Sequence, residues 1–362
     1  MTGFVPPPYP YERLGEVSKV AATHDGGAVD LSIGTPCDAP PPEVIEALGL
    51  GTSARGYPPS IGTAALRAAA ARWMQRRLGA TVDPDTQLAA CVGTKEFVAS
   101  VPGYLHLRDP SRDTVLYPIV SYPTYEMGAT LAGLRAVPYA RLADIDDADA
   151  GRALALWVNS PGNPTGELSD LAVAAAWGRA RGIPVLSDEC YAEFSWAAGP
   201  TTILQSGVAG VLAVHSLSKR DNFAGARIGF YAGDPELVSY LREVRKHAGL
   251  MPAGPVQHAA IVALDDDAHV DRQRERYARR LERLRDVLGA CGYPASLPDG
   301  AFYLWVAVPS GDAWGAALDL ARQAGIVVSP GEFYGPTGTD HIRVAAVQPD
   351  ERIDLAARRV GA

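Results

Sequence analysis

The feature that most constrains the fold is a series of short, continuous apolar segments separated by helical patterns. The segments are TVLYP at 114, ALALWVNS at 153, IPVLSDE at 183, VLAVHS at 211 and IGFYAG at 228. The helical patterns include TAALRAAAARWMQRRL at 63–78 and DLAVAAAWGRARG at 170–182, the second ended by a glycine. Strands without polar alternation are buried on both faces, as in parallel sheets that helices cover on both sides. The pattern therefore predicts an α/β domain with a mostly parallel sheet.

The chain of 362 residues exceeds the length of one average domain. We place the large domain at residues 46–245. Residues 1–45 are expected to form an N-terminal arm and part of a smaller domain, because the opening FVPPPYP (4–10) lacks the backbone donors of regular structure. Residues 246–362 combine a charged helical pattern with the strand-like FYLWVAV (302–308), which predicts a small C-terminal α+β domain.

The charge and the cysteines exclude several classes of function. Lys and Arg number 33 and Asp and Glu 41, so the net charge is −8, whereas nucleic-acid and anionic-membrane surfaces are basic. The four cysteines show neither metal-ligand nor disulfide spacing, so we expect no metal site. No segment has the length of a membrane span or the pattern of a secretory leader. We expect a soluble cytoplasmic protein that acts on small molecules, with no nucleic-acid or membrane partner.

Polar motifs follow the predicted strands at the positions where α/β proteins bind ligands. In open α/β sheets this position is the carboxyl edge of the sheet. NSPGNPTG (159–166), SDECY (187–191) and HSLSK (215–219) each come directly after an apolar segment, and VGTKE (92–96) precedes a helix. We expect the four motifs to form one site.

Two of the motifs have the composition of a phosphate site. The turn of Gly93, Thr94 and Lys95 opens a helix, and its free backbone N–H groups and the helix N-terminus favour a phosphate. For Lys95 the backbone N–H is the expected donor. The hydroxyls of Ser216 and Ser218 and the guanidinium at position 227 can complete this phosphate cup.

The other motif residues suit a ring-bearing aldehyde cofactor. Lys219 offers an amine for a Schiff base, and Asp188 can hold a proton on a ring nitrogen. Asn163 and Tyr191 can donate hydrogen bonds to a phenolate oxygen of the ring. Each residue alone has a simpler interpretation: a solvated lysine, a helix-capping aspartate, or a turn in the case of NSPGNPTG. Their convergence on one sheet edge favours the chemical role.

Taken together, the motifs resemble those of the class I/II aminotransferases, which are pyridoxal-phosphate enzymes of fold type I. NSPGNPTG, SDECY, SLSKxxNxxGxR with Arg227, and HIRVA (341–345) occur in family order, and the similarity covers essentially the whole chain. The resemblance implies a large αβα domain with a mostly parallel sheet, a smaller α+β domain and pyridoxal 5'-phosphate (PLP) as cofactor. It makes Lys219 the lysine that bonds the cofactor and then carries the proton.

The same resemblance implies roles for five further positions. Tyr122, in SYPTYEMGA, matches the aromatic residue that stacks on the cofactor ring, and Tyr57, in ARGYPPSIG, matches a tyrosine that reaches the phosphate of a neighbouring subunit. Arg343 matches the arginine that binds the substrate α-carboxylate, beside Asn163 and the backbone of Gly34. The resemblance therefore also implies a homodimer, with amino acids and 2-oxo acids as substrates.

The segments DLSIGTPCDAPP, GTKEFVASVPGYL, VRKHAGLMPAGPVQHAA and SPGEFYGPTG resemble more closely the succinyldiaminopimelate aminotransferases of the actinobacterial type. That group exchanges an amino group between L-glutamate and N-succinyl-2-amino-6-oxopimelate, in diaminopimelate and lysine biosynthesis. Ala226, Arg220 and Asp221 depart from the usual residues, and we interpret them as variation beside the phosphate cup.

Other functions remain as alternatives. Within the cofactor class these are another α-amino-acid aminotransferase, of the aspartate, aromatic or LL-diaminopimelate type, and a C–S lyase. SLSK (216–219) also fits the S-x-x-K motif of penicillin-recognising acyl enzymes, but S-D-N and K-T-G are missing from the sequence. The aminotransferase-like sensing domains of transcription regulators follow a DNA-binding domain, whereas we expect the core of this chain to begin within its first few dozen residues.

Overall fold

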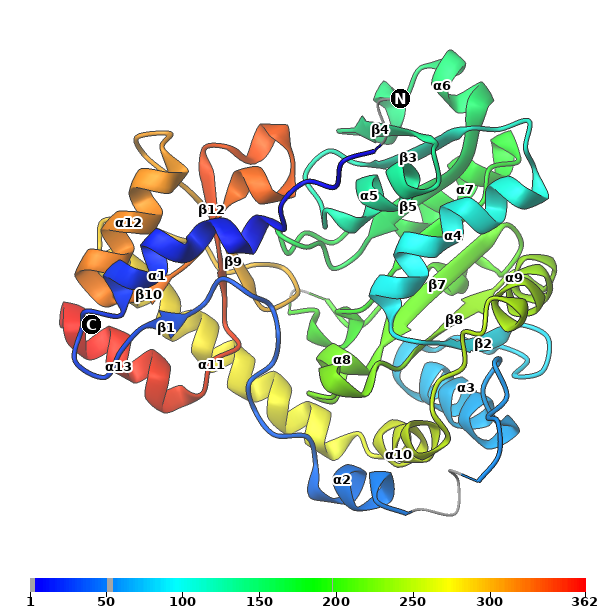
Figure 1. The fold of residues 1–362 in the computed structure, drawn as a ribbon, viewed down its shortest axis with the longest axis horizontal. Helices are drawn as coiled ribbons and strands as arrows, with labels where there is room; N and C mark the ends of the chain where they lie inside the picture. Colours follow the sequence, from blue (N-terminus) through cyan, green and yellow to red (C-terminus); the bar gives the residue numbers. More distant parts are fainter. Residues whose placement is uncertain (1–3, 51–54, 197) are drawn as a thin grey trace. The chain divides into compact units, whose positions relative to one another are not determined.

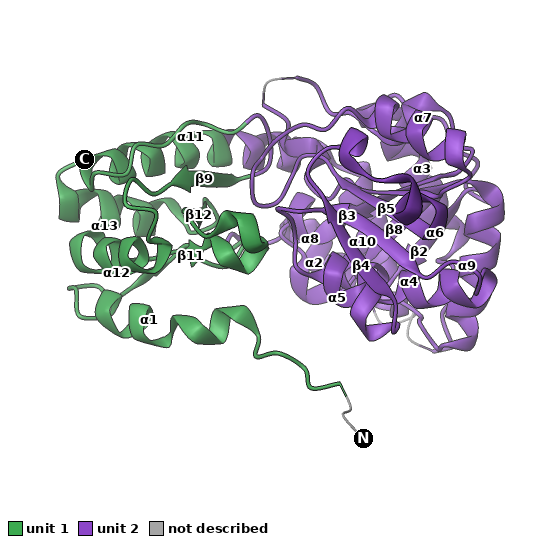
Figure 2. Ribbon diagram, turned by 90° about the horizontal axis from the view of Figure 1, so that it is seen from above, with its two compact units in different colours: residues 1–37, 276–298, 302–362 green, residues 38–275, 299–301 purple. Residues whose placement is uncertain are grey.

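The computed structural model describes residues 4–50, 55–196 and 198–362, and the chain divides into two compact units (Figure 2). Unit 1 comprises Met1–Cys37, Arg276–Pro298 and Phe302–Ala362. Unit 2 comprises Asp38–Glu275 and Asp299–Ala301. The two units are divided at other residues than the domain boundaries that we predicted after residues 45 and 245. Those boundaries stay a prediction.

A seven-stranded sheet in the order β2-β8-β7-β6-β5-β3-β4 forms the centre of unit 2 (Figure 1). Its strands are β2 (Leu88–Cys91), β3 (Thr114–Pro118), β4 (Arg135–Tyr139), β5 (Ala153–Asn159), β6 (Val185–Asp188), β7 (Val211–Ser216) and β8 (Gly229–Gly233). From β4 to β7 all neighbouring strands are parallel, which confirms the predicted mostly parallel sheet. β8 is antiparallel to both of its neighbours, β7 and β2. The connection from β7 to β8 contains only short helical turns, so it makes no parallel crossover.

Helices cover both faces of this sheet. One face packs against α3 (Ala64–Leu78), α7 (Leu171–Arg181) and α10 (Gly254–Asp265), and the other packs against α4 (Thr94–Arg108), α5 (Thr124–Leu131) and α9 (Pro235–His247). Successive residues of a strand point to opposite faces. In β5, Leu156 and Val158 accordingly belong to the first core and Ala155 and Trp157 to the second. The two cores explain why the strand sequences are apolar throughout.

Local signals set the ends of the predicted helices. The Thr63 hydroxyl accepts a hydrogen bond from the Leu66 N–H at the start of α3, and Gly79 ends that helix in the left-handed conformation. Asp170 and Gly182 do the same for α7. The remaining helices of unit 2 are α2 (Pro42–Leu48), α6 (Asp147–Arg152), α8 (Leu217–Arg220) and the 3-10 turns Leu142–Asp144, Ala192–Phe194, Ile203–Ser206 and Ala224–Ala226.

Unit 1 contains a three-stranded antiparallel sheet in the order β11-β12-β9, with β9 (Tyr303–Ala307), β11 (Ser329–Pro330) and β12 (His341–Ala345). A second pair joins β1 (Val29–Asp30) and β10 (Ile326–Val327). The helical segments are Pro10–Leu14, α1 (Gly15–Ala21), α12 (Ala313–Ala324), Gly331–Tyr334, Pro336–Gly338, α13 (Asp350–Val360) and α11 (Ala268–Ala290), whose first turns belong to unit 2. In the described part of the chain, no helix combines the length and the apolar character needed to cross a membrane.

Candidate active site

The carboxyl edge of the large sheet brings the four predicted motifs together. Asn159, the last residue of β5, is paired in register with Asp188, the last residue of β6, and Asp188 is paired with Val214 of β7. On the other side, Gly229 is paired with both Ser216 and Cys91, so the turn after β2 lies beside the turn after β7. The predicted convergence of the motifs is therefore present in unit 2.

Asp188 is buried and receives a donor on each carboxylate oxygen. The Tyr125 hydroxyl donates to Oδ2 at 2.9 Å, and the Cys190 backbone N–H donates to Oδ1 at 3.2 Å. Burial raises the pKa of Asp188, while these two hydrogen bonds and the charge of Lys219 act in the opposite direction. The next helical turn, Ala192–Phe194, is preceded by Tyr191, so Asp188 is not its capping residue.

Asn159 organises the loop that carries Asn163. Its side-chain amide donates to the Asp188 carbonyl at 2.9 Å and to the Pro161 carbonyl at 3.2 Å, and its Oδ1 accepts from the Asn163 N–H at 2.8 Å. Asn163 and Tyr191 are both 6% exposed. The sequence analysis gave no role to Asn159, although its place at the end of an apolar strand was the available signal.

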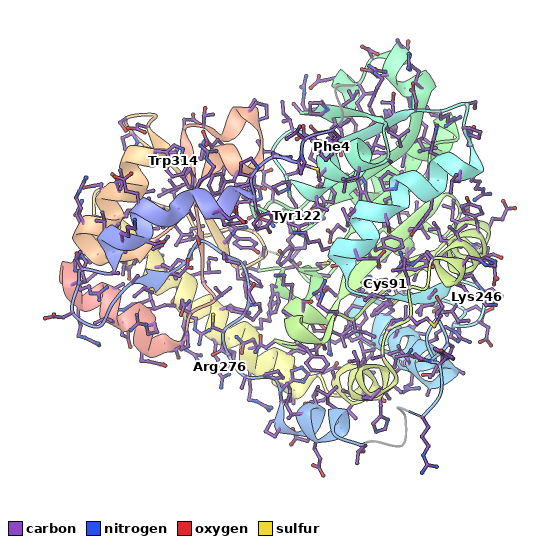
Figure 3. All side chains as sticks on the ribbon, in the orientation of Figure 1. Phe4, Cys91, Tyr122, Lys246, Arg276 and Trp314 are labelled. Carbon is purple, nitrogen blue, oxygen red and sulfur yellow. The ribbon has the colours of Figure 1, made fainter. Side chains whose placement is uncertain are left out.

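Lys219 lies in α8, the short helix that directly follows β7. Ser216 caps this helix, because its hydroxyl accepts from the Ser218 N–H at 3.1 Å. The Lys219 side chain is only partly exposed. By contrast Lys246, labelled on α9 in Figure 3, is 62% exposed and pairs with Glu243 at 3.8 Å. Of these two lysines, Lys219 is therefore the one placed at the motif cluster.

Gly93 and Arg227 form the centre of the predicted phosphate cup. Gly93, at φ 77°, is the N-cap of α4, and a Cβ added there would lie 2.3 Å from Nη2 of Arg227. Arg227 itself has φ 55°, and its Nη1 donates to the Ala224 carbonyl at 3.0 Å. A helix N-terminus under a guanidinium is a donor set that fits a phosphate. Thr94 lies beside it and accepts from the Cys190 thiol at 3.4 Å, whereas Lys95 is exposed.

Tyr122, labelled in Figure 3, stands just before α5 and is half-buried. Its ring meets the Tyr125 ring edge-on, with centroids 6.0 Å apart. Tyr125 was missed by the sequence analysis. Its place three residues after Tyr122, in the same SYPTYEMGA motif, was the available signal.

Arg220 and Asp221, interpreted from the sequence as simple variation, form a buried polar network next to Lys219. Arg220 is 4% exposed and donates to Glu193 at 3.2 Å, to Asp221 at 2.5 Å and to the Ala263 carbonyl at 2.7 Å. His269 lies 2.8 Å from the same Asp221 oxygen. These contacts tie α8 to α10 and the start of α11, which is a structural role that the sequence analysis did not foresee.

In unit 1, Arg343 and Gly34 both lie against Tyr303. Arg343, in β12, is 1% exposed, and its guanidinium carbon lies 4.3 Å from the ring centre of Tyr303 and 4.7 Å from that of Tyr334. A Cβ on Gly34 would lie 2.0 Å from the Tyr303 hydroxyl oxygen, so a larger residue does not fit there. The Arg343 Nη2 also lies 3.4 Å from the Tyr11 hydroxyl, a contact that none of the sequence motifs predicts.

Tyr57 does not join the buried residues of unit 2, because its side chain is 97% exposed.

Comparison with known proteins identifies the family. The chain matches the model of aminotransferases of class I and II over residues 27–360. The chain belongs to this family. It is therefore a PLP-dependent aminotransferase of fold type I, acting on amino and oxo acids, and the expected fold, enzyme class and cofactor are confirmed.

Two curated relatives are similar over nearly the whole chain. The 4-dedimethylamino-4-oxo-anhydrotetracycline transaminase OxyQ of Streptomyces rimosus is 44% identical, over 98% of this chain and 99% of its own. A probable aminotransferase of Mycobacterium tuberculosis is 41% identical, over 98% and 85%. The expected succinyldiaminopimelate group is thus not singled out by these relatives.

Two solved structures show the same fold. An aminotransferase of Neisseria meningitidis has a TM-score of 0.88 at 30% identity, covering 98% of this chain and 97% of its own. The N-succinyldiaminopimelate aminotransferase of Mycobacterium tuberculosis has a TM-score of 0.84 at 26% identity, covering 96% of each chain.

Proposed function

We propose that this aminotransferase uses L-glutamate to aminate N-succinyl-2-amino-6-oxopimelate, giving N-succinyl-LL-2,6-diaminopimelate and 2-oxoglutarate in lysine and diaminopimelate biosynthesis. The observation that carries the amino-transfer chemistry is the edge of unit 2 where Asp188, Lys219 and the Gly93–Arg227 pair meet. The substrate assignment rests on the segments that resemble the succinyldiaminopimelate group. The likeness to the M. tuberculosis enzyme of that name supports it.

The residues at the carboxyl edge of unit 2 support the proposed cofactor contacts. The N–H groups at Gly93, Thr94 and Lys95 would hold the phosphate together with Arg227, and the hydroxyls of Ser216 and Ser218 would add further donors. Asp188 would hold a proton on the ring nitrogen, and its burial would strengthen that ion pair because the local dielectric is low.

Three side chains would hold the ring. Tyr122 would stack on its face, while Asn163 and Tyr191 would donate to the ring oxygen. All three lie at the carboxyl edge of the sheet or on its loops.

Lys219 performs the proton transfers. PLP, when bound, supplies an electron sink that makes the α-proton of the substrate acidic. Lys219 would hold the cofactor through its amine. With a substrate bound, the same amine would be the general base that takes the substrate α-proton and the acid that returns a proton.

Substrate recognition is assigned to unit 1 and to a second subunit. Arg343 binds the α-carboxylate through two guanidinium N–H groups, and the Gly34 backbone lies beside the same tyrosine as Arg343. We further propose a homodimer in which Tyr57 reaches the phosphate of the neighbouring active site, which agrees with its nearly complete exposure.

A second candidate acceptor is a polycyclic 4-oxo compound. The 44% identity to the oxo-anhydrotetracycline transaminase, over nearly the full length of both chains, favours it. In that case the amino-transfer residues keep their roles, and only the contacts to the distal part of the acceptor differ.

The visible absorption of the purified holoenzyme distinguishes these functions. We expect the band of the lysine-bound cofactor to disappear with glutamate and with N-succinyl-LL-diaminopimelate, but not with free diaminopimelate or cysteine. After reaction with glutamate, recovery of the band by an oxo-anhydrotetracycline and not by N-succinyl-2-amino-6-oxopimelate would favour the second acceptor. Pyruvate release from cysteine would indicate a C–S lyase. A Lys219→Ala protein that transaminates normally would refute the assignment.

A further inference from the structure

Tyr125 occupies the position between two of the proposed cofactor contacts. Its hydroxyl donates to Oδ2 of Asp188 at 2.9 Å, and its ring meets Tyr122 edge-on at 6.0 Å. Its other neighbour is Trp157, which stacks on it with centroids 5.1 Å apart and an angle of 25°. Tyr125 and Trp157 are both 0% exposed, so the phenol ring has no freedom to turn away from Asp188.

The hydrogen bond from the Tyr125 hydroxyl acts against the effect of burial on Asp188. A buried carboxylate loses its hydration and shifts toward the neutral form. The donors to this carboxylate act in the opposite direction and favour its charged form: the side chain and the backbone N–H of Cys190 and the Tyr125 hydroxyl. Burial and the neighbouring carboxylate raise the pKa of Tyr125 well above its usual value, so the phenol stays protonated and can serve only as the donor to Asp188.

We propose that Tyr125 is a positioning residue of the cofactor site: its hydroxyl keeps Asp188 charged and aimed so that the carboxylate can hold a proton on the ring nitrogen. This inference rests on the proposed role of Asp188. Because the first turn of α5 carries Tyr125 three residues after Tyr122, one segment sets both the ring-stacking and the ring-nitrogen contact. The proposed role of Tyr125 is exerted through Asp188.

One substitution separates the contribution of the Tyr125 hydroxyl from that of its ring. Tyr125→Phe keeps the stack on Trp157 and the contact with Tyr122, but removes the donor to Asp188. Tyr139→Phe is the matched control. Tyr139 packs against the core on the other face of the sheet, and its hydroxyl donates to the backbone carbonyl of Trp157 at 2.7 Å and not to the carboxylate.

The experiment compares two cofactors on the apo-protein. PLP and its 1-deaza analogue differ only in the ring nitrogen, which a carbon replaces, and their dissociation constants are measured by absorbance titration. We expect Tyr125→Phe to weaken PLP binding about tenfold or more, since hydrogen bonds to charged groups are worth about 1.5–3 kcal/mol. Binding of the deaza analogue should change less than about twofold, because it has no ring-nitrogen proton for Asp188 to hold.

Two outcomes overturn the inference. Equal losses with both cofactors would show a general packing role, and an unchanged PLP affinity would show that the hydroxyl is dispensable. Tyr139→Phe should leave the ratio of the two affinities at the wild-type value. In an Asp188→Asn background, Tyr125→Phe should add no further selective loss, and a full additional loss there would place its effect elsewhere.

Failure of the proposed function gives a different pattern. If Lys219 and Asp188 do not form the cofactor site, the wild-type apo-protein shows no absorbance band with PLP, and Asp188→Asn leaves binding unchanged. If only the role of Tyr125 is wrong, wild type and Asp188→Asn behave as expected and Tyr125→Phe alone equals wild type. Circular-dichroism melting of each variant confirms that it is folded before titration.

Discussion

The guanidinium of Arg227 lies directly over the α-carbon of Gly93, so close that a Cβ at position 93 would be 2.3 Å from Nη2. The N-terminus of α4 and the arginine therefore face the same small volume. Only a residue without a side chain permits this approach. This pair gives a direct test of the phosphate cup.

We predict that Gly93→Ala lowers the affinity for PLP by at least about tenfold, because the new methyl group displaces Arg227 from the phosphate. Gly79→Ala is the matched control, since Gly79 has φ 63° and nothing within 4 Å of an added Cβ. Both variants should lose about 1 kcal/mol of stability through backbone strain. Equal PLP affinities of the two variants, measured by titration of the apo-proteins, would contradict the cup.

For the two lysines we predict opposite results. Lys219→Ala should lose the cofactor absorbance band that responds to glutamate, and its activity should fall by several orders of magnitude, on the order of 10⁴-fold or more. Lys246→Ala should keep both, because this exposed side chain makes only a surface ion pair with Glu243 at 3.8 Å. Borohydride reduction followed by peptide mass spectrometry identifies the modified lysine directly.

The carboxylate-binding role of Arg343 predicts a loss shared by all α-amino-acid donors. Arg343→Lys keeps the charge but not the planar pair of donors, so kcat/KM should fall about a hundredfold for glutamate and for every other donor. PLP affinity should stay within about twofold of wild type, because the proposed phosphate and ring contacts belong to other residues. A defect restricted to one donor would argue against a common carboxylate site.

Removing Arg220 should destabilise the protein strongly. Its side chain is 5% exposed and pairs with Glu193 and Asp221 inside unit 2, so Arg220→Ala removes the cation that these two buried carboxylates share and leaves Glu193 with Arg77 and Asp221 with His269. We expect a loss of about 3–5 kcal/mol in urea unfolding followed by circular dichroism. Arg72→Ala breaks the exposed pair with Asp265 and should cost less than about 1 kcal/mol. Comparable losses in the two variants would show that the buried network is not stabilising.

For the buried pair Glu189 and His215 we predict opposite effects of pH on stability. The Glu189 Oε2 atom lies 3.4 Å from the His215 Nε2 atom. Burial raises the pKa of Glu189 from 4.5 to about 7, so its contribution to stability is complete below pH 4.5 and is lost as the pH rises through 7. Burial lowers the pKa of His215 from 6.5 to about 3, so its contribution is present above pH 6.5 and is lost as the pH falls toward 3.

The two substitutions separate these contributions. Relative to wild type, Glu189→Gln should gain stability as the pH rises from 4.5 to 7, and His215→Phe should gain stability as the pH falls from 6.5 to 3, each by a few kcal/mol at most. Unfolding midpoints of the apo-proteins across this range provide the measurement. If the unfolding midpoints of wild type and both variants changed with pH in parallel, the two pKa shifts would not be those of Glu189 and His215.

The sequence by itself determined the local features of this protein. Thr63, Asp170 and the glycines that follow α3 and α7 set helix ends through contacts with their own neighbours. Apolar segments of strand length predicted the buried sheet, and the polar motifs after them predicted one site, because parallel strands end at a common edge. The positions of Asp188 and Lys219 at that edge followed from this reasoning without knowledge of the tertiary fold.

The tertiary structure alone decided the features that depend on distant residues. The antiparallel pairing of β8 with β2, the Tyr125–Asp188 hydrogen bond, the buried Arg220 network and the contact of Gly34 with Tyr303 join segments far apart in the chain. Periodicity and local propensity report the environment of a segment but not its partner. These pairings are fixed only when the sheet and the cores assemble, because the free energy of each contact depends on burial by the rest of the fold.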